Sequence, residues 1–177
     1  MNLRERKLKL ELNKIDLPHA KEEYELFSTM PKDENGFENE YAGIGFEEFK
    51  TKAIPAMLEM AQGKNLPSGY VPASTYILWL DGVPVGIFKL RHYLNDFLRQ
   101  GPGHLGYGIR KEYRGHGLAS QGLTLAIEKA KSIIPESELY LACHKDNPAS
   151  LRVMQKNGGY LDHEDEKEYY VRIPLND

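Results

Sequence analysis

The segment that most restricts the fold is a strand, a glycine-containing turn and a helix over residues 104–119. Gly115 and Gly117 stand directly before a stretch with apolar residues at helical spacing, which predicts a helix over residues 118–134. Glycine leaves its backbone N–H open to a ligand, and the start of a helix carries partial positive charge. Arg114 adds a permanent positive charge and a forked donor. The turn therefore predicts a site for an anion such as a phosphate group.

The same glycines also fit a plain connection between a strand and a helix, because short glycine-rich patterns are weakly specific. The turn is not a P-loop, since no Lys-Ser or Lys-Thr pair follows its glycines. It also lacks the third glycine of a dinucleotide-binding fingerprint. The local sequence leaves the anion site and the plain turn as alternatives.

The rest of the chain predicts a mixed α/β sheet in a single domain over residues 1–177, with residues 1–70 as a strand and helices before a core at residues 71–177. Pro55 predicts a kink inside the second helix. The acidic run at residues 162–168 predicts a solvated loop or hairpin, or alternatively a lip that attracts a cationic acceptor. Apolar periodicity and turn signals predict strands at residues 7–17, 74–80, 83–92, 104–110, 138–143 and 168–175, and helices from residue 18 and over 46–61, 118–134 and 148–157.

Composition excludes several classes of protein. The single cysteine, Cys143, excludes an internal disulfide, and no Cys/His spacing is typical of a zinc site, so we expect no bound metal. No apolar run approaches the ~20 residues that cross a membrane, and the N-terminus does not resemble a secretory signal. A formal net charge of −3 gives no general attraction to nucleic acid. We therefore expect a cytoplasmic protein with neither a nucleic-acid nor a membrane partner.

Two motifs lie in order along the second half of the chain. Arg114, Gly117 and Ala119 form the pattern Arg-x-x-Gly-x-Ala after a strand and at the start of a helix, and Asn147 and Ser150 open a second helix that ends in Lys-Asn-Gly-Gly-Tyr. Both patterns resemble motifs of the GNAT superfamily, the acyl-CoA N-acyltransferases. The resemblance is specific over residues 103–160 and looser over residues 71–92. It implies an α/β (α+β) fold with a mostly antiparallel central sheet flanked by helices, and acetyl-CoA as the cosubstrate.

The resemblance also implies which residues contact the cosubstrate. The backbone of residues 107–109 would pair with the pantetheine arm as an added strand does. Asn147 equally fits a helix N-cap before Pro148, and Ser150 a residue that satisfies a free N–H in the first turn. The complete set of cofactor-binding residues that the resemblance implies is Tyr107, Gly108, Ile109, Arg114, Gly115, His116, Gly117, Leu118, Ala119, Asn147 and Ser150.

The family's chemistry is direct attack of an acceptor amine on the thioester of acetyl-CoA. We expect a backbone N–H near Gly108 or Ile109 to polarise the thioester carbonyl. Many family members carry a tyrosine as general acid seven positions after the motif asparagine, but Met154 occupies this position and cannot donate a proton. Tyr160 is the substitute that we expect, with Tyr140 as an alternative; the other interpretation of Tyr160 is a buried aromatic residue of the sheet.

His104 is the expected general base, because histidine is suited to proton transfer near neutral pH; the alternative is a solvated or hydrogen-bonding residue at the end of the strand. Cys143 is expected in the core, since no activating partner is apparent for an acyl-enzyme. The expected acceptor is a primary amine on a small molecule, with a protein amine as the alternative, and a homodimer stays open. Because the tyrosine is missing, the alternative function is an acyl-CoA-binding sensor or interaction domain without turnover.

Overall fold

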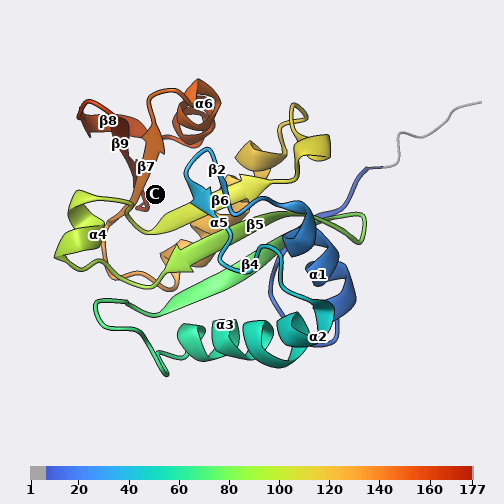
Figure 1. Ribbon diagram of the computed structural model, residues 1–177. Coiled ribbons are helices and arrows are strands. Elements are labelled where there is room, and N and C mark those ends of the chain that lie inside the picture. The colour runs from blue at the N-terminus through green and yellow to red at the C-terminus, as the bar shows by residue number, and fades with distance from the viewer. Residues whose placement is uncertain (1–6, 177) are drawn as a thin grey trace, which may run out of the picture.

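The computed structural model describes residues 7–176, and its largest sheet has four antiparallel strands. The strand order is β1-β4-β5-β6 (Figure 1), with β1 at Leu10–Lys14, β4 at Ala73–Leu80, β5 at Val83–Arg91 and β6 at Leu105–Ile109. Asp81 and Gly82 join β4 to β5 with φ values of 48° and 79°, the left-handed conformation that tight hairpins use. The predicted hairpin is thus present.

A second sheet of three antiparallel strands stands beside β6. Its order is β7-β9-β8, with β7 at Glu138–His144, β9 at Glu168–Pro174 and β8 at Tyr160–Glu164. Within residues 7–176, an isolated bridge between Gly103 and Leu141 is the single β-pairing between this sheet and the larger one. Figure 1 shows the second sheet turned away from the end of β6. The two sheets therefore separate along a line between β6 and β7.

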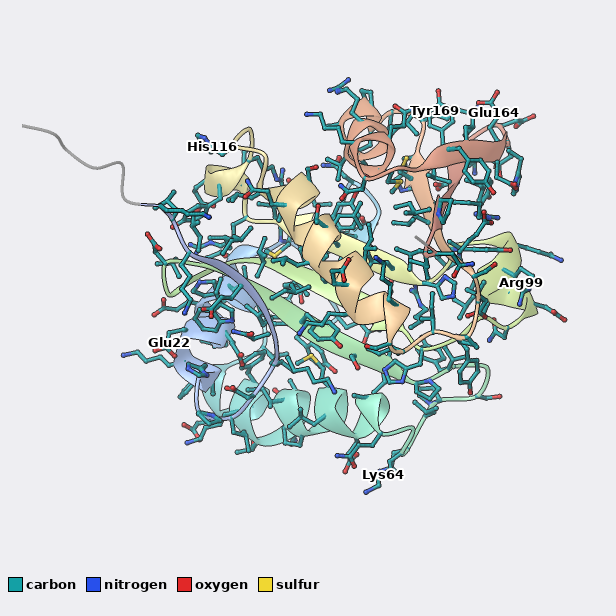
Figure 2. All side chains as sticks on the ribbon, turned by 180° about the vertical axis from the view of Figure 1, so that it is seen from behind. Glu22, Lys64, Arg99, His116, Glu164 and Tyr169 are labelled. Atoms are coloured by element: carbon teal, nitrogen blue, oxygen red, sulfur yellow. The ribbon has the colours of Figure 1, made fainter. Side chains whose placement is uncertain are left out.

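Helices cover both faces of the larger sheet. On one face α1 (Ala20–Thr29), α2 (Phe46–Glu48) and α3 (Ile54–Ala61) form an apolar core with Ile77 and Ile87. On the other face α5 (Leu118–Lys131) packs over Phe88, and Figure 2 shows this helix crossing the sheet. Because both faces are covered, every residue of β4 except the last is buried. None of the helices within residues 7–176 is long and apolar enough to cross a membrane.

Several short elements surround the line of separation. They are a hairpin of β2 (Asp33–Glu34) and β3 (Phe37–Glu38), the helix α4 (Asp96–Gln100), a 3-10 turn (Lys111–Tyr113) and the helix α6 (Pro148–Lys156). Asn35 and Gly36 form the hairpin turn with φ values of 55° and 85°. Figure 1 shows this hairpin lying across β6. It brings a segment from the first quarter of the chain next to the glycine turn.

The mixed, mostly antiparallel fold that the sequence predicted is confirmed. A π-helical turn at Phe49–Ala53 interrupts the second helix next to Pro55, so the predicted irregularity is present. The acidic run spans the end of β8, the turn after it and the first residue of β9, in agreement with the hairpin prediction. The strands β2 and β3, the helix α4, the 3-10 turn and the strand β8 were not predicted. The helix α4 has only five residues and depends on the Asn95 side chain as its cap, and all five residues of β8 are exposed, so neither carries a clear apolar period.

Gly122 allows α5 to approach the sheet closely. A Cβ atom on Gly122 would collide with the ring of Phe88, which is fully buried and stacked on Tyr107. We expect Gly122→Ala to lower the free energy of unfolding by about 1–3 kcal/mol, although alanine favours a helix. Denaturant unfolding measures this, with Gln121→Ala as an exposed control that should change stability by less than about 0.5 kcal/mol. A Gly122→Ala variant as stable as the wild type would contradict the close packing.

Candidate active site

The strands β6 and β7 are joined at one end and separate toward the other. At the joined end, the His104 N–H donates to the Tyr140 carbonyl over 2.7 Å. Farther along, the Tyr107 hydroxyl of β6 and the Ser150 Oγ of α6 lie 3.0 Å apart. A side-chain contact thus takes the place of strand pairing there. We call the region between these strands the β6–β7 opening.

The alternation of hydrogen bonds along β6 determines which backbone groups face the opening. The backbones of His104 and Arg110, at the two ends of β6, bond to β5 over 2.7 and 2.8 Å. In an antiparallel ladder, bonding residues alternate with residues whose N–H and C=O point away from that neighbour. The N–H groups of Tyr107 and Ile109 therefore point toward the opening. Of the two positions expected to polarise a carbonyl, Ile109 has the outward N–H and Gly108 does not.

The absence of a side chain at Gly108 allows the β2–β3 hairpin to pack closely against β6. A Cβ atom on this residue would lie 2.8 Å from the Met30 Cε and 3.0 Å from the ring of Phe37. Gly108, one of the two positions expected to polarise the carbonyl, is thus required for packing on this face of β6.

The glycine turn leads into α5, and Figure 2 shows His116 at its tip. Gly115 and Gly117 have φ values of 81° and 76°, which glycine adopts without strain. A Cβ atom at Gly115 would meet nothing within 4 Å, so the turn is open. Leu118 is buried and Ala119 half-buried, so ligand contact there would come from backbone N–H groups. The first N–H groups of a helix lack helical partners, which fits this turn to a phosphate group.

Arg114 is already engaged by neighbouring groups. Its Nε donates to the Ile109 carbonyl over 2.9 Å, and its Nη1 donates to Oε1 of Glu34 over 2.8 Å. The guanidinium holds the pKa of the Glu34 carboxyl below its usual value through this hydrogen bond. Arg114 therefore joins the glycine turn to the β2–β3 hairpin, a connection between residues 80 positions apart.

Asn147 caps α6, as one of its two interpretations predicted. Its Oδ1 accepts a hydrogen bond from the Ser150 N–H over 3.2 Å, and Pro148 takes the first helical position. The Ser150 hydroxyl is directed to Tyr107 instead. The cap thereby places a hydroxyl pair beside the opening.

The structure does not support His104 as the catalytic base. Its side chain is 0% exposed, Nδ1 accepts from the Tyr140 N–H over 2.9 Å, and Nε2 lies 3.0 Å from Oε2 of Glu136. Burial lowers the pKa of His104, although Glu136 opposes this shift. Because both nitrogens are occupied and no solvent reaches them, His104 fits the alternative interpretation of a hydrogen-bonding strand residue.

Tyr160 also lies away from the opening. It sits on β8, and β9 separates β8 from β7. Its hydroxyl donates to Glu138 over 2.7 Å on the surface, and the side chain is 44% exposed. The general-acid role expected for Tyr160 therefore has no geometric support. Tyr140, the other candidate, is covered by the guanidinium of Arg172, 3.7 Å from the ring centre.

Groups that keep their protons line the opening. Burial raises the pKa of the Tyr107 hydroxyl to about 12 and that of the Cys143 thiol to about 11. Tyr107 therefore stays a hydrogen-bond donor at neutral pH, and Cys143 stays a thiol that packs in the core, as predicted. Met154 is also buried in the core and provides no donor.

The sequence reasoning missed one polar pair at the opening. Nδ1 of His144, the last residue of β7, lies 2.7 Å from Oε1 of Glu168, the first residue of β9. No local pattern identifies this pair, because the pairing of β7 with β9 is what brings the two side chains together.

Comparison with protein families gives a match over most of the chain. A family model described as "Acetyltransferase (GNAT) domain" matches residues 26–159. The matched range includes the β2–β3 hairpin, the glycine turn, the β6–β7 opening and α6. No curated protein was found to match the chain.

Solved structures share the fold at low sequence identity. One is RimL, a ribosomal L7/L12 alpha-N-protein acetyltransferase in complex with coenzyme A, with 19% identity, a TM-score of 0.64 and coverage of 95% of this chain and 96% of that one. Another is a ribosomal-protein-S5-alanine acetyltransferase from Vibrio fischeri, with 17% identity, a TM-score of 0.63 and coverage of 95% and 94%. A chimera of a Vibrio cholerae spermidine N-acetyltransferase and hSSAT has 14% identity, a TM-score of 0.61 and coverage of 94% and 95%.

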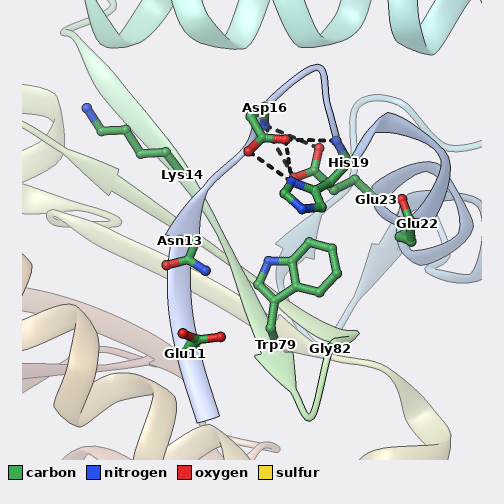
Figure 3. Close-up of a pocket in the computed structure, with 9 residues that line it drawn as sticks. All are labelled: Glu11, Asn13, Lys14, Asp16, His19, Glu22, Glu23, Trp79 and Gly82. Atoms are coloured by element: carbon green, nitrogen blue, oxygen red, sulfur yellow. Dashed lines mark hydrogen bonds and ion pairs between the residues drawn. The ribbon is translucent and has the colours of Figure 1, made fainter. Parts of the chain in front are cut away.

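A hollow of about 290 Å³ lies elsewhere, between β1 and the start of α1 (Figure 3). None of the residues expected to bind a cofactor lines it. Its wall includes Glu23, which is 1% exposed and whose two carboxylate oxygens each lie 3.3 Å from the Asp16 N–H. Burial raises the pKa of Glu23 from 4.5 to about 8, and the carboxylates of Asp16 and Glu22 act in the same direction.

Glu23 should make the stability of the protein depend on pH. Between about pH 4.5 and 8 the folded protein retains a proton that the unfolded chain has lost, so stability falls as pH rises. The free energy of unfolding of the wild type should fall by up to about 1.4 kcal/mol per pH unit relative to Glu23→Gln. Urea unfolding from pH 5 to 8 tests this, with Glu25→Gln, an exposed residue of the same helix, as control. Parallel pH curves for the wild type and Glu23→Gln would contradict it.

Proposed function

Because the chain belongs to the GNAT family of N-acetyltransferases, we propose that it transfers the acetyl group of acetyl-CoA to a primary amine by direct attack. The observation that carries this proposal is the β6–β7 opening, in which N–H groups of β6 that point away from β5 lie beside an open glycine turn. An extended ligand with a phosphate group at one end matches both features. The single, buried Cys143 is compatible with the reducing cytoplasm, where we place the protein.

The residues of this region fit acetyl-CoA. Gly115 and Gly117 present backbone donors at the start of α5, in a turn that Arg114 and Lys111 make cationic. The outward backbone groups of Tyr107 and Ile109 suit an amide-containing arm that adds to the edge of β6. Asn147 lies at the other side of the opening, at the start of α6.

Acetyl-CoA supplies an activated thioester. We assign the Ile109 N–H as the donor that polarises the carbonyl oxygen, because of the two expected positions, Gly108 and Ile109, Ile109 is the one whose N–H points toward the opening. The Tyr107–Ser150 hydroxyl pair is placed to hydrogen-bond the departing sulfur, and Tyr107 keeps its proton for this purpose. The first role keeps Ile109, one of the two expected positions, and the second replaces the role expected for Tyr160.

The acceptor that we propose is a primary amine on a small molecule. The spermidine N-acetyltransferase chimera among the similar structures supports this class. The ribosomal-protein acetyltransferases support a second candidate, the N-terminal amine of a protein. A panel of spermidine, L-lysine and short peptides with a free N-terminal Ser or Ala therefore separates the two candidates.

Binding and turnover can be measured separately. Acetyl-CoA at about 100 times its Kd should raise the melting temperature by roughly 5–10 °C, because it binds only the folded chain. Release of CoA thiol with at least one amine of the panel is the expected second result. An unchanged melting temperature would contradict acetyl-CoA binding. A shift without thiol release for any amine would favour the binding-domain alternative, for which Met154 is the supporting feature.

Arg114 should contribute to cofactor affinity if its guanidinium turns from Glu34 to the pyrophosphate. Arg114→Gln is expected to weaken CoA binding about tenfold, the effect of losing one charge-assisted hydrogen bond. Glu34→Gln frees the guanidinium and should not weaken binding. Isothermal titration with CoA measures both variants. Equal affinity of Arg114→Gln and the wild type would show that the Arg114 side chain only holds the hairpin.

A further inference from the structure

The pair of His144 and Glu168 has the arrangement of a general base and its orienting group. Nδ1 of His144 lies 2.7 Å from Oε1 of Glu168, and the two residues are directly opposed in the pairing of β7 with β9. The side chains are 42% and 25% exposed, so the imidazole is accessible while its partner is largely held. His144 thus differs from the fully buried His104.

Strand alternation places His144 on the hairpin side of β7. Its neighbour Cys143 packs into the core shared with α5, so the side chain of His144 points to the opposite face. On that face, a Cβ atom at Gly36 would lie 2.5 Å from Nε2 of His144, which shows that the turn of the β2–β3 hairpin lies against the ring. Only glycine fits at position 36, because any side chain there would collide with the ring of His144.

The same hairpin connects His144 with β6. Gly36 contacts His144, and the next residue, Phe37, lies against Gly108. Two consecutive hairpin residues therefore touch the two strands that border the β6–β7 opening, on one face. His144 lies across the opening from the segment whose Ile109 N–H we assign to the thioester carbonyl.

The carboxylate of Glu168 decides which nitrogen of His144 carries the proton. With Nδ1–H donating to Glu168, the lone pair of the ring lies on Nε2, the nitrogen beside the Gly36 turn, and this is the form that accepts a proton from a nucleophile. The pairing of β7 and β9 fixes both partners on rigid strands. This arrangement supplies the base that His104 cannot provide.

We propose that His144 is the catalytic base that removes the proton from the acceptor amine, and that Glu168 is its positioning residue. This inference rests on the proposed acetyl transfer. In the reaction the amine nitrogen forms a bond to the carbonyl carbon, and the C–S bond breaks to release the CoA thiolate. The amine proton passes to Nε2 of His144 and then to solvent, from which the thiolate takes up a proton.

The test uses acetyl-CoA and whichever amine of the panel gives the fastest thiol release with the wild type. His144→Gln should lower kcat by about 100-fold or more, the usual contribution of a general base, with an unchanged Kd for acetyl-CoA. Glu168→Gln should lower kcat by about tenfold or more without changing that Kd, because the imidazole loses its orienting partner. Melting temperatures of both variants should stay near that of the wild type.

His163→Gln is the matched control. His163 makes the same kind of pair, with Nδ1 2.7 Å from Oδ2 of Asp162, and its side chain is 49% exposed, but it lies on β8. Its kcat should equal that of the wild type. A kcat of His144→Gln within about threefold of the wild-type kcat would overturn the proposal. A large fall in the kcat of His144→Gln would also overturn it if the Kd for acetyl-CoA rose by the same factor, or if the kcat of His163→Gln fell equally. Absence of thiol release by the wild type with every amine would instead overturn the acetyl transfer itself, and the base role with it.

Discussion

The candidate site depends on the buried contacts between Gly103, His104 and Tyr140 that join the two sheets at one end. Gly103 lies so close to Tyr140 that a Cβ atom would collide with the Tyr140 carbonyl oxygen. Beside it, His104 bonds to Tyr140 twice, through its own N–H and through Nδ1. Glu136 holds the other ring nitrogen. A histidine without solvent access at this point fixes where β6 and β7 meet, and the strands diverge from there.

The divergence explains the polar character of the opening. A paired β6 would use the outward N–H groups of Tyr107 and Ile109 in a ladder, and none would be left for a ligand. Side chains hold the separation: Tyr107 reaches Ser150 across the opening, and Arg114 ties the hairpin to the glycine turn. β6 thus forms no ladder of hydrogen bonds with β7 along the opening, and the side-chain contacts that take their place can be replaced by a ligand. The residues that hold β6 and β7 apart therefore affect both the stability of the protein and the access of a ligand to the opening.

Local sequence patterns predicted the elements and the two motif segments well, because apolar periodicity and capping involve neighbours within a few residues. The glycine turn, the Asn147 cap and the core position of Cys143 belong to this class. The same patterns could not place His104 or Tyr160. Whether His104 is buried depends on Glu136 and Tyr140, which lie more than 30 residues away. The position of Tyr160 follows from β8, an exposed edge strand without apolar alternation.

The histidines of this chain show why the base is harder to predict than the cofactor turn. A phosphate site is formed by backbone N–H groups in a particular conformation, and the spacing of glycines in the sequence indicates that conformation. A base is defined by what lies beside the ring, and His104, His144 and His163 each have a carboxylate partner within 3.0 Å. The three histidines differ in their place in the sheets. His104 is buried between the two sheets, His163 lies on the outer strand β8, and His144 lies against the β2–β3 hairpin. The chemistry of the site is therefore fixed by how β7 pairs with β9, a contact between residues 24 positions apart.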